Sequence, residues 1–422
     1  MDIEQLNNWN PWWRTKEVPR VFLGVARIFN PLIFKALQER EVIALTGIRR
    51  SGKTTLMYQI IDSLLRTNNP KHILYVNLDD EALKNESLES IFALYRQHLN
   101  PDQPAFVFLD EIQNNDGWEK FLKKYYDLHE PIKFIISGSS AHLLRGEFST
   151  LLTGRNLTFT IYPLSFREFL EFAGVDHSTI TSQARSKIIH ELYHYLEFGG
   201  FPEVYFKEKD LKVLLLKQYF DDIIYKDIVQ RHNINAKKIT DLAIYLLTNI
   251  ANAFTIRKIR QFTGLSIDSI KDYISHLEDT YMLLPLGHFS YSLQKKSQIP
   301  QKSYAIDCGL RNVVGFRFSS DVGRLAENCV RAELQRRGLD AYYWKGNGEV
   351  DFIVKHKDNS LLAINVSFTD ALDSREIRSL EEFAAAFKKT TQLIVLTRDM
   401  EEKRGNVFLV PLWKWLLELN NV

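Results

Sequence analysis

The sequence predicts an α/β protein of several domains, and three observations support this fold class. The first third alternates short apolar runs with helical stretches, which is the pattern of strands buried on both faces of a parallel sheet. The chain has 422 residues, enough for two to four domains that each bury a core. Its 45% hydrophobic and 25% charged residues are typical of a globular protein.

Composition narrows the class of protein. The net charge of +2 is too small to indicate nucleic-acid binding by itself, so any basic surface must be local. Cys308 and Cys329 are the only cysteines, which excludes a disulfide framework and fits a reducing compartment. The start of the chain lacks the layout of a signal peptide, and no apolar run approaches the ~20 residues that span a bilayer. We therefore expect a cytoplasmic protein with no membrane partner.

The predicted sheet domain covers residues 31–165, after an N-terminal segment 1–30. Its expected strands are EVIALT (41–46), HILYVN (72–77), AFVFL (105–109), KFIIS (133–137) and NLTFTIY (156–162). From 166 to 232 the apolar period is helical, interrupted by GGFP at 199–202, where two glycines and a proline must end a helix. We expect this stretch to be a helical lid.

The strongest motif is GIRRSGKT, Gly47 to Thr54, between the first strand and a helical stretch. It matches the phosphate-binding pattern G-x-x-x-x-G-K-[ST] in the strand, loop and helix context that the pattern requires. Backbone N–H groups would surround the phosphates of ATP, Lys53 would reach the outer phosphates, and Thr54 would ligate Mg²⁺. The predicted nucleotide-binding residues are Gly47, Ile48, Arg49, Arg50, Ser51, Gly52, Lys53, Thr54 and Thr55. Arg49 and Arg50 either touch nucleotide or a neighbouring subunit, or are solvated.

Two acids complete the predicted nucleotide site. FVFLDEIQ ends a buried strand at Asp110 and Glu111. Asp110 would hold Mg²⁺ together with Thr54, and Glu111 would orient or deprotonate the attacking water. The pair therefore indicates hydrolysis of ATP. Ser137, at the end of the next strand, is a candidate sensor of the γ-phosphate, and Arg155 is a candidate arginine finger acting across a subunit boundary. Both are alternatively plain surface residues.

Residues 233–315 have the outline of a winged helix. Thr255 and Ser266 are good N-caps for two successive helices, and strand-like YMLLPLGHF and KSYAID follow around a polar segment. Between residues 235 and 303 nine basic and five acidic residues give a local charge of +4. The predicted DNA-contacting residues are Arg257, Lys258, Arg260, Lys295 and Lys296. The second helix of the pair is mostly polar or acidic, which argues against base-specific reading, and winged helices also dock proteins.

The motifs GIRRSGKTTL, FLDEIQN, IISGSSA, LTGRN, YPLSFREF, FGGFPEVY, YAIDCGLRN, GRLAENCVRAEL and EVDFI occur in this order along nearly the whole chain. They resemble a family of bacterial and archaeal AAA-type ATPases. The resemblance implies a P-loop AAA-type parallel sheet with a helical lid, followed by a winged helix and a restriction-endonuclease-like α/β domain. It also implies ATP hydrolysis at Gly47 to Thr54 with Asp110 and Glu111, and it places Arg155 in the family's glycine-arginine motif.

The C-terminal region, residues 316–422, carries acids at the places where nucleases of this fold bind metal. Period-two geometry puts Glu349 and Asp351 on one face of a strand, and Asn365 and Ser367 on one face of the next. Glu327, on a preceding helix, would complete the cluster. Mg²⁺ binding is driven by charged oxygen ligands, and Asn365 is neutral where a second acid is expected.

The lysine expected in the same motif is replaced by Ser367, although Lys345, Lys355 or Lys357 could substitute for it. We therefore expect a degenerate nuclease site that binds or packs without cutting.

HELYH, His190 to His194, formally matches the zinc-protease pattern H-E-x-x-H. No H-x-x-G-x-x-H continuation follows, and the segment lies in the expected lid, so we do not assign a protease. Stoichiometric zinc in a metal analysis would reopen the question.

The sequence as a whole predicts an ATP-hydrolysing protein, with Mg²⁺ as cofactor, whose nucleotide cycle drives or switches DNA engagement. The expected DNA is duplex or branched and is read with little sequence preference, and Arg155 implies a homo-oligomer. Two alternatives stay open: an ATP-dependent switch or scaffold that docks protein partners without DNA, and an ATP-gated DNA nuclease.

Overall fold

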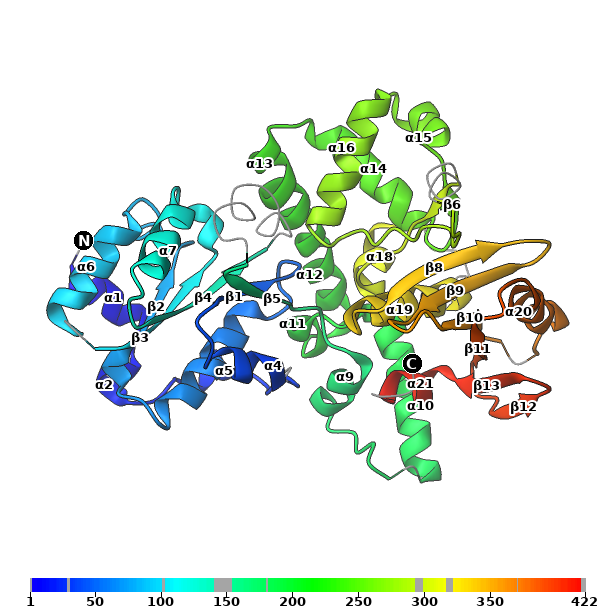
Figure 1. Ribbon diagram of the computed structural model, residues 1–422, viewed down its shortest axis with the longest axis horizontal. Helices are drawn as coiled ribbons and strands as arrows, with labels where there is room; N and C mark the ends of the chain where they lie inside the picture. The colour runs from blue at the N-terminus through cyan, green and yellow to red at the C-terminus, as the bar shows by residue number, and fades with distance from the viewer. Residues whose placement is uncertain are drawn as a thin grey trace. The chain divides into compact units, whose positions relative to one another are not determined.

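A computed structural model of the chain forms two compact units, Met1–Ile161 and Tyr162–Val422 (Figure 1). It describes residues 2–28, 31–100, 103–139, 154–179, 181–292, 299–315, 322–369 and 371–418. Among these residues no helix is both long and apolar enough to cross a membrane.

The first unit is built on a five-stranded parallel sheet of order β2-β3-β4-β1-β5. The strands are β1 (Val42–Thr46), β2 (Ile73–Asn77), β3 (Ala105–Asp110), β4 (Ile132–Gly138) and β5 (Asn156–Thr160). The four strands β1 to β4 are buried along nearly their whole length, as their continuous apolar runs predict. The expected parallel sheet is thus present, with all five strands at the predicted places.

Helices cover both faces of this sheet (Figure 1). They are α1 (Ile3–Trp9), α2 (Trp12–Thr15), α3 (Arg20–Leu23), α4 (Pro31–Ala36), α5 (Lys53–Leu65), α6 (Leu88–His98) and α7 (Trp118–Asp127), with 3-10 turns η1 (Pro70–His72) and η2 (Ile112–Asn114). The N-terminal helices are anchored by two tryptophans. The indole Nε1 atoms of Trp12 and Trp13 both donate to the carbonyl of Ile73, at 3.1 and 2.8 Å. The N-terminal segment is therefore part of the core of this unit.

The second unit begins with helices, as the sequence predicts for the lid. They are α9 (Phe166–Phe172), α10 (Ser182–Phe198), α11 (Pro202–Tyr205), α12 (Lys209–Asp222), a π-helix η4 (Ile223–Val229) and α13 (Gln230–His232). The GGFP segment at 199–202, where α10 ends, packs against the residues at the start of α18 (Cys308–Val314). Asp307 accepts from the N–H of Gly200 at 2.7 Å and caps α18 through the N–H of Leu310 at 3.0 Å. A Cβ on Gly199 would lie 2.0 Å from the Asp307 carboxylate, so this close approach requires glycine.

The next segment has the element order expected of a winged helix. It contains α14 (Ala236–Thr248), β6 (Ala253–Phe254), α15 (Ile256–Thr263), α16 (Ile267–Asp279) and β7 (Gln301–Lys302), with β6 antiparallel to β7. Thr255 and Ser266 cap α15 and α16 as predicted. The strand expected in YMLLPLGHF is reduced to isolated bridges at Leu283, Leu286 and His288. Pro285 lacks an N–H, but the residues on either side of it still donate to this partner segment, Leu284 to the Tyr304 carbonyl and Leu286 to the Lys302 carbonyl.

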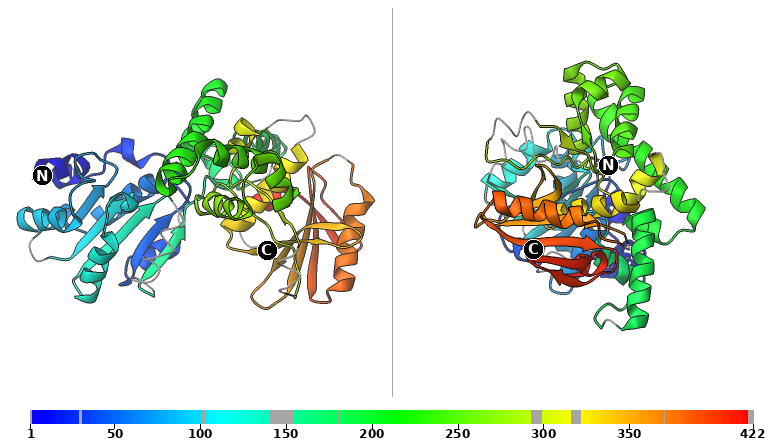
Figure 2. Two further views of the ribbon diagram at one scale, coloured as in Figure 1. Left: turned by 90° about the horizontal axis from the view of Figure 1, so that it is seen from above. Right: turned by 90° about the vertical axis from the view of Figure 1, so that its right-hand side faces the viewer.

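The C-terminal part of the second unit is a six-stranded mixed sheet of order β12-β13-β11-β10-β9-β8. Its elements are α19 (Val322–Arg336), β8 (Asp340–Lys345), β9 (Glu349–Lys355), β10 (Leu361–Ser367), α20 (Ser374–Ala386), β11 (Thr390–Thr397), β12 (Glu402–Arg404), β13 (Val407–Pro411) and α21 (Leu412–Leu417). Strands β8, β9 and β10 are antiparallel, whereas β10, β11 and β13 are parallel. Figure 2 shows α20 running along this sheet.

Candidate functional site

The phosphate loop joins β1 to α5 and depends on backbone that glycine adopts easily. Gly47 and Gly52 have φ of +138° and +97°, and Arg50 also has positive φ, +68°. A Cβ on Gly47 would lie 2.1 Å from the carbonyl oxygen of Ile161, which leaves no room for a side chain. The loop is therefore held in one tight shape at the N-terminus of α5, where the helix dipole favours an anion.

Lys53 lies inside this loop, with a side chain that is 4% exposed. Its Nζ donates to the carbonyls of Gly47 and Ile48 at 3.0 and 3.2 Å. Three donors on one ammonium allow it to contact a phosphate oxygen while keeping part of this network. Of the two loop arginines, Arg49 is half-buried and Arg50 is exposed.

Asp110 ends β3 and accepts hydrogen bonds from three hydroxyls. Its Oδ2 accepts from Thr54 Oγ1 and from the Tyr75 hydroxyl, both at 2.7 Å, and its Oδ1 accepts from Ser137. Two ligands in neighbouring octahedral positions around Mg²⁺ lie about 3.0 Å apart, given metal–oxygen distances of about 2.1 Å. The Thr54 hydroxyl and the Asp110 carboxylate therefore have both the chemistry and the spacing that Mg²⁺ requires.

Glu111 follows directly, in a left-handed conformation with φ of +53°. Its N–H donates to Ser137 Oγ at 3.1 Å, and its carboxylate accepts from the Gln113 amide. Burial and the neighbouring Asp110 charge raise the pKa of Glu111 above its ordinary value, against the opposing effect of Lys53. A carboxylate with a raised pKa is a better proton acceptor for an attacking water.

Three residues of this site were missed by the sequence analysis: Tyr75, Gln113 and Arg27. Tyr75 reaches Asp110 from the neighbouring strand, and the Arg27 guanidinium donates to the carbonyl of Ser51 in the loop at 2.8 Å. No local motif marks Arg27, which lies 24 residues before its partner.

Arg155 lies at the amino-terminal ends of the parallel strands, whereas the phosphate loop lies at their carboxyl-terminal ends. It directly precedes β5, where its carbonyl accepts from the N–H of Val42 at the start of β1, whereas the loop follows the end of β1. Five residues at about 3.3 Å each separate the two edges by roughly 16 Å. Arg155 is paired with Asp127 at 3.1 Å, and its guanidinium lies 5.4 Å from the Tyr126 ring centre. It is therefore too far away to act on its own nucleotide site.

The predicted DNA residues Arg257, Lys258 and Arg260 are exposed on α15. Lys295 and Lys296 lie outside the described residues. Phe262, on the same helix, and Ile267, at the start of α16, are 59% and 45% exposed. The surface around α15 is thus both basic and partly apolar.

The three acids of the C-terminal cluster lie close together in the structure, and the ammonium group of a lysine lies between them. Lys302, from β7, lies 3.2 Å from Glu327, 2.7 Å from Glu349 and 3.6 Å from Asp351, and is 3% exposed. Tyr304 donates a further hydrogen bond to Glu327, at 2.5 Å. The prediction that Glu327, Glu349 and Asp351 lie together therefore agrees with the structure.

The charges of this cluster are strongly coupled. Burial alone would lower the pKa of Lys302, but the three carboxylates raise it well above its ordinary value. Burial and Asp351 raise the pKa of Glu327 to about 7 despite the opposing effect of Lys302. Lys302 is therefore firmly charged and supplies positive charge where a metal ion would be expected.

Asn365 and Ser367 have structural contacts. Asn365 is fully buried, accepts from the N–H of Asp351 at 3.1 Å and donates to Ser379 Oγ at 2.9 Å. Ser367 Oγ lies 3.5 Å from Thr369 Oγ1. The sequence analysis considered Lys345, Lys355 and Lys357 as substitutes for the missing lysine. The lysine that enters the cluster is instead Lys302, from the distant strand β7, which contacts Glu349 and Asp351 of β9.

Comparison with known families agrees with this architecture. Residues 39–170 match an AAA domain, residues 189–321 match a domain of unknown function (DUF8612), and residues 322–415 match another (DUF4143). The chain is 33% identical to uncharacterized protein MJ1544 of Methanocaldococcus jannaschii over 417 residues, covering 93% of this chain and 92% of the relative. It is 29% identical to an uncharacterized protein of Haemophilus influenzae over 388 residues, covering 89% and 94% of the two chains.

Similar solved structures include the Orc1 protein of Aeropyrum pernix in complex with DNA, with a TM-score of 0.35, 11% identity, and coverage of 72% of this chain and 96% of that one. Cdc6p of Pyrobaculum aerophilum gives a TM-score of 0.30 and 10% identity over 74% and 98% of the two chains. These low scores establish no functional relationship. The AAA domain match and the full-length relatives show that the chain belongs to a family of bacterial and archaeal AAA-type ATPases with a C-terminal domain of unknown function.

Proposed function

We propose that the protein binds ATP with Mg²⁺ at Gly47 to Thr55 and hydrolyses it. The observation that carries this proposal is the 2.7 Å contact between the Thr54 hydroxyl and the Asp110 carboxylate, with Glu111 next in the chain. A loop of N–H groups, a lysine, two oxygen ligands and a carboxylate base are the parts that phosphoryl transfer to water requires.

Each residue then has a separate role. The loop N–H groups and Lys53 bind the phosphates, and Thr54 and Asp110 hold Mg²⁺, which supplies charge neutralisation on the phosphate oxygens when bound. Glu111 takes a proton from the attacking water. Ser137 donates a hydrogen bond to the Asp110 carboxylate and accepts one from the Glu111 N–H, so it fixes the positions of both acids. Arg155 would complete the site of a neighbouring copy, which makes a homo-oligomer part of the proposal.

We further propose that the nucleotide cycle drives or switches engagement of duplex or branched DNA through the basic α15. The domain division 1–30, 31–165, 166–232, 233–315 and 316–422 belongs to this proposal. The exposed Arg257, Lys258 and Arg260 support phosphate contacts without base reading.

The C-terminal cluster is proposed to be cleavage-dead. A divalent ion would have to displace an ammonium that contacts all three carboxylates, and neutral Asn365 offers no replacement charge. This argues against the ATP-gated nuclease.

The second candidate function is an ATP-dependent switch that docks proteins and never meets DNA. Exposed apolar side chains favour it: Phe262 and Ile267 near α15, and a surface cavity of about 420 Å³ lined by Lys207, Leu211, Leu214, Leu215 and Gln218. Exposed apolar side chains that line one surface cavity, as Leu211 and Leu214 do, are typical of sites that bind a partner.

The deciding experiment is the steady-state ATP hydrolysis rate of the full chain with and without duplex DNA. We expect Lys53→Ala to abolish hydrolysis, the exposed control Lys120→Ala to retain it, and DNA to stimulate it several-fold. A Lys53-dependent rate that ignores duplex and branched DNA would favour the protein-docking switch.

A matched experiment tests the DNA surface. Replacing Arg257, Lys258 and Arg260 with alanine should weaken DNA binding equally for all sequences and reduce the slope of log affinity against log salt by up to ~3. Lys345→Ala, on an exposed site elsewhere, serves as the control. Unchanged binding in the triple variant would place any DNA surface elsewhere.

A further inference from the structure

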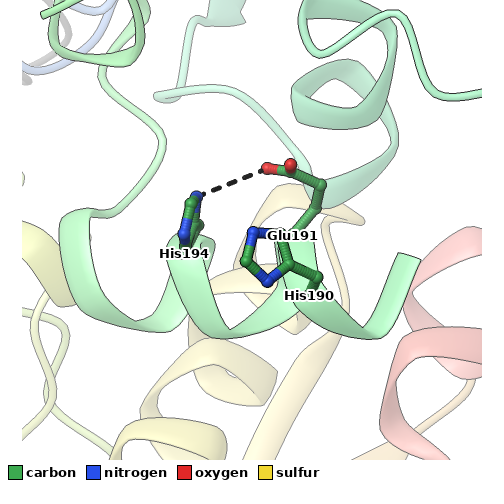
Figure 3. Close-up of side chains that lie close together, drawn as sticks. All are labelled: His190, Glu191 and His194. Atoms are coloured by element: carbon green, nitrogen blue, oxygen red, sulfur yellow. Dashed lines mark ion pairs between the residues drawn. The ribbon is translucent and has the colours of Figure 1, made fainter. Parts of the chain in front are cut away.

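His190, Glu191 and His194 lie close together on α10, as Figure 3 shows. The two imidazoles are one helical turn apart, and their ring centres lie 4.4 Å from each other. One ligand atom from each of the three residues lies within 4.8 Å of the other two. Among the described residues this is the one group of three or more such side chains with metal-ligand spacing.

The carboxylate of Glu191 gives an independent reason to expect a cation. Its Oε2 is buried and accepts no hydrogen bond from the described residues, although it lies 3.7 Å from Nδ1 of His194. A buried carboxylate oxygen without a partner is costly. Lys212 is the nearby positive group, and its Nζ lies over the rings of Phe198 and Tyr205, at 5.0 and 5.7 Å, without a hydrogen bond to Glu191 among the described contacts.

We infer that His190, Glu191 and His194 bind a divalent transition-metal ion of the zinc class. Imidazole nitrogens with one carboxylate oxygen suit Zn²⁺, Ni²⁺ or Cu²⁺, whereas Mg²⁺ and Ca²⁺ prefer oxygen ligands alone. Ligands at about 2.0–2.2 Å from Zn²⁺ lie roughly 3.4 Å apart in tetrahedral geometry, so the three side chains need only small rotamer changes to meet one ion.

The site is a binding site and not a protease centre. Glu191 contributes the third ligand atom, so it is not available as the base of a zinc protease. The fourth position of the ion is left for water or for a donor from another molecule. A neighbouring face of the helix is held by Tyr193, which packs against Phe368 with ring centres 6.0 Å apart.

The test is metal binding to the full-length protein, stripped with a chelator and dialysed, with no nucleotide present. Titration calorimetry with Zn²⁺ should show one saturable equivalent, and Co²⁺ should give the visible absorption of a four- or five-coordinate ion. His190→Ala combined with His194→Ala should abolish both signals, and Glu191→Gln should weaken binding by about 10-fold or more.

Two controls separate this site from others. His98→Ala removes an exposed helical histidine outside the cluster and should bind as the parent does, and Lys53→Ala should also bind normally, because the nucleotide site is not involved. The unfolding temperature of each metal-free variant checks that the substitutions leave the fold intact. Absence of saturable Zn²⁺ binding, or binding that survives the double histidine variant, would overturn the inference.

Discussion

The phosphate loop and the C-terminal acidic cluster each set a buried lysine and a tyrosine hydroxyl near carboxylates, but the two lysines have different partners. Lys53 donates to the carbonyls of Gly47 and Ile48, while the carboxylate of Asp110 accepts hydrogen bonds from the hydroxyls of Thr54, Tyr75 and Ser137. Lys302 instead contacts Glu327, Glu349 and Asp351 directly.

This difference separates a site that can accept a metal ion from one that already has its counter-charge. A neutral hydroxyl can stay beside a carboxylate when Mg²⁺ arrives, and Thr54 can become a ligand itself. A buried ammonium must leave before a divalent ion enters, and its removal uncovers desolvated carboxylates. Acids and a lysine in one site therefore do not by themselves indicate metal binding. The atoms that the lysine contacts decide whether the acids are available to a metal ion.

The largest expected effect is on Glu111. Glu111→Gln keeps the shape of the side chain and removes the base, so we expect the rate of ATP hydrolysis to fall by ~10²- to 10⁴-fold while ATP binding persists. Single-turnover kinetics and nucleotide binding measure the two separately. Glu130→Gln, an exposed change in the same unit, is the control. Hydrolysis that remains within a few-fold of the parent would show that another group activates the water.

The next effect is on Lys302. Lys302→Met leaves the largely buried Glu327 and Asp351, and the more exposed Glu349, without this cation and should lower the free energy of unfolding by ~3–5 kcal/mol. Lys302 opposes the burial and the Asp351 charge that raise the pKa of Glu327, so its removal should raise this pKa further, and the loss of stability should grow as pH rises above the parent value of about 7.

Urea unfolding at pH 5.5 and pH 8 measures this dependence, with Lys388→Met as the exposed control. A loss that is equal at both pH values would contradict the electrostatic role that we assign to Lys302.

The smallest effect sharpens the comparison at Asn365. Asn365→Asp restores the acid expected in a nuclease, but it removes donors to Ser379 and Glu376, so we expect a loss of ~1–3 kcal/mol in stability. We also expect no Mg²⁺-dependent DNA cleavage, because Lys302 stays in place. Asn406→Asp is an exposed control for the charge change. Appearance of cleavage would show that Lys302 serves the chemistry of the site.

Much of the first unit could be predicted from the sequence, because its signals are local. Continuous apolar runs predict the five strands, and the spacing of Gly47, Gly52 and Lys53 fixes the loop shape that the structure shows. Thr54 and Asp110 could be paired in advance, since both lie at the carboxyl edge of a parallel sheet.

The contacts that could not be predicted join segments without a shared motif. Lys302 is one of nine lysines and arginines in its segment and has no sequence feature that points to β9. Arg27 and Tyr75 are far from the nucleotide-binding motifs in the sequence, and only the folded chain brings their side chains to the site. The π-helix η4 follows α12 with no break in the apolar period, so the pattern alone predicts an ordinary helix there.

The position of Lys302 also changes how fragments of this protein should be designed. A fragment that ends at residue 315 would expose the Lys302 ammonium, which is only 3% exposed in the whole chain. A fragment that starts at residue 316 would leave Glu327 and Glu349 without their counter-ion. Backbone hydrogen bonds from Phe289 to Tyr343 and from Tyr343 to Gly287 would be cut as well. An isolated fragment that ends at residue 315 would thus carry one more surface charge than the same segment in the intact protein, and its affinity for any polyanion would be an overestimate.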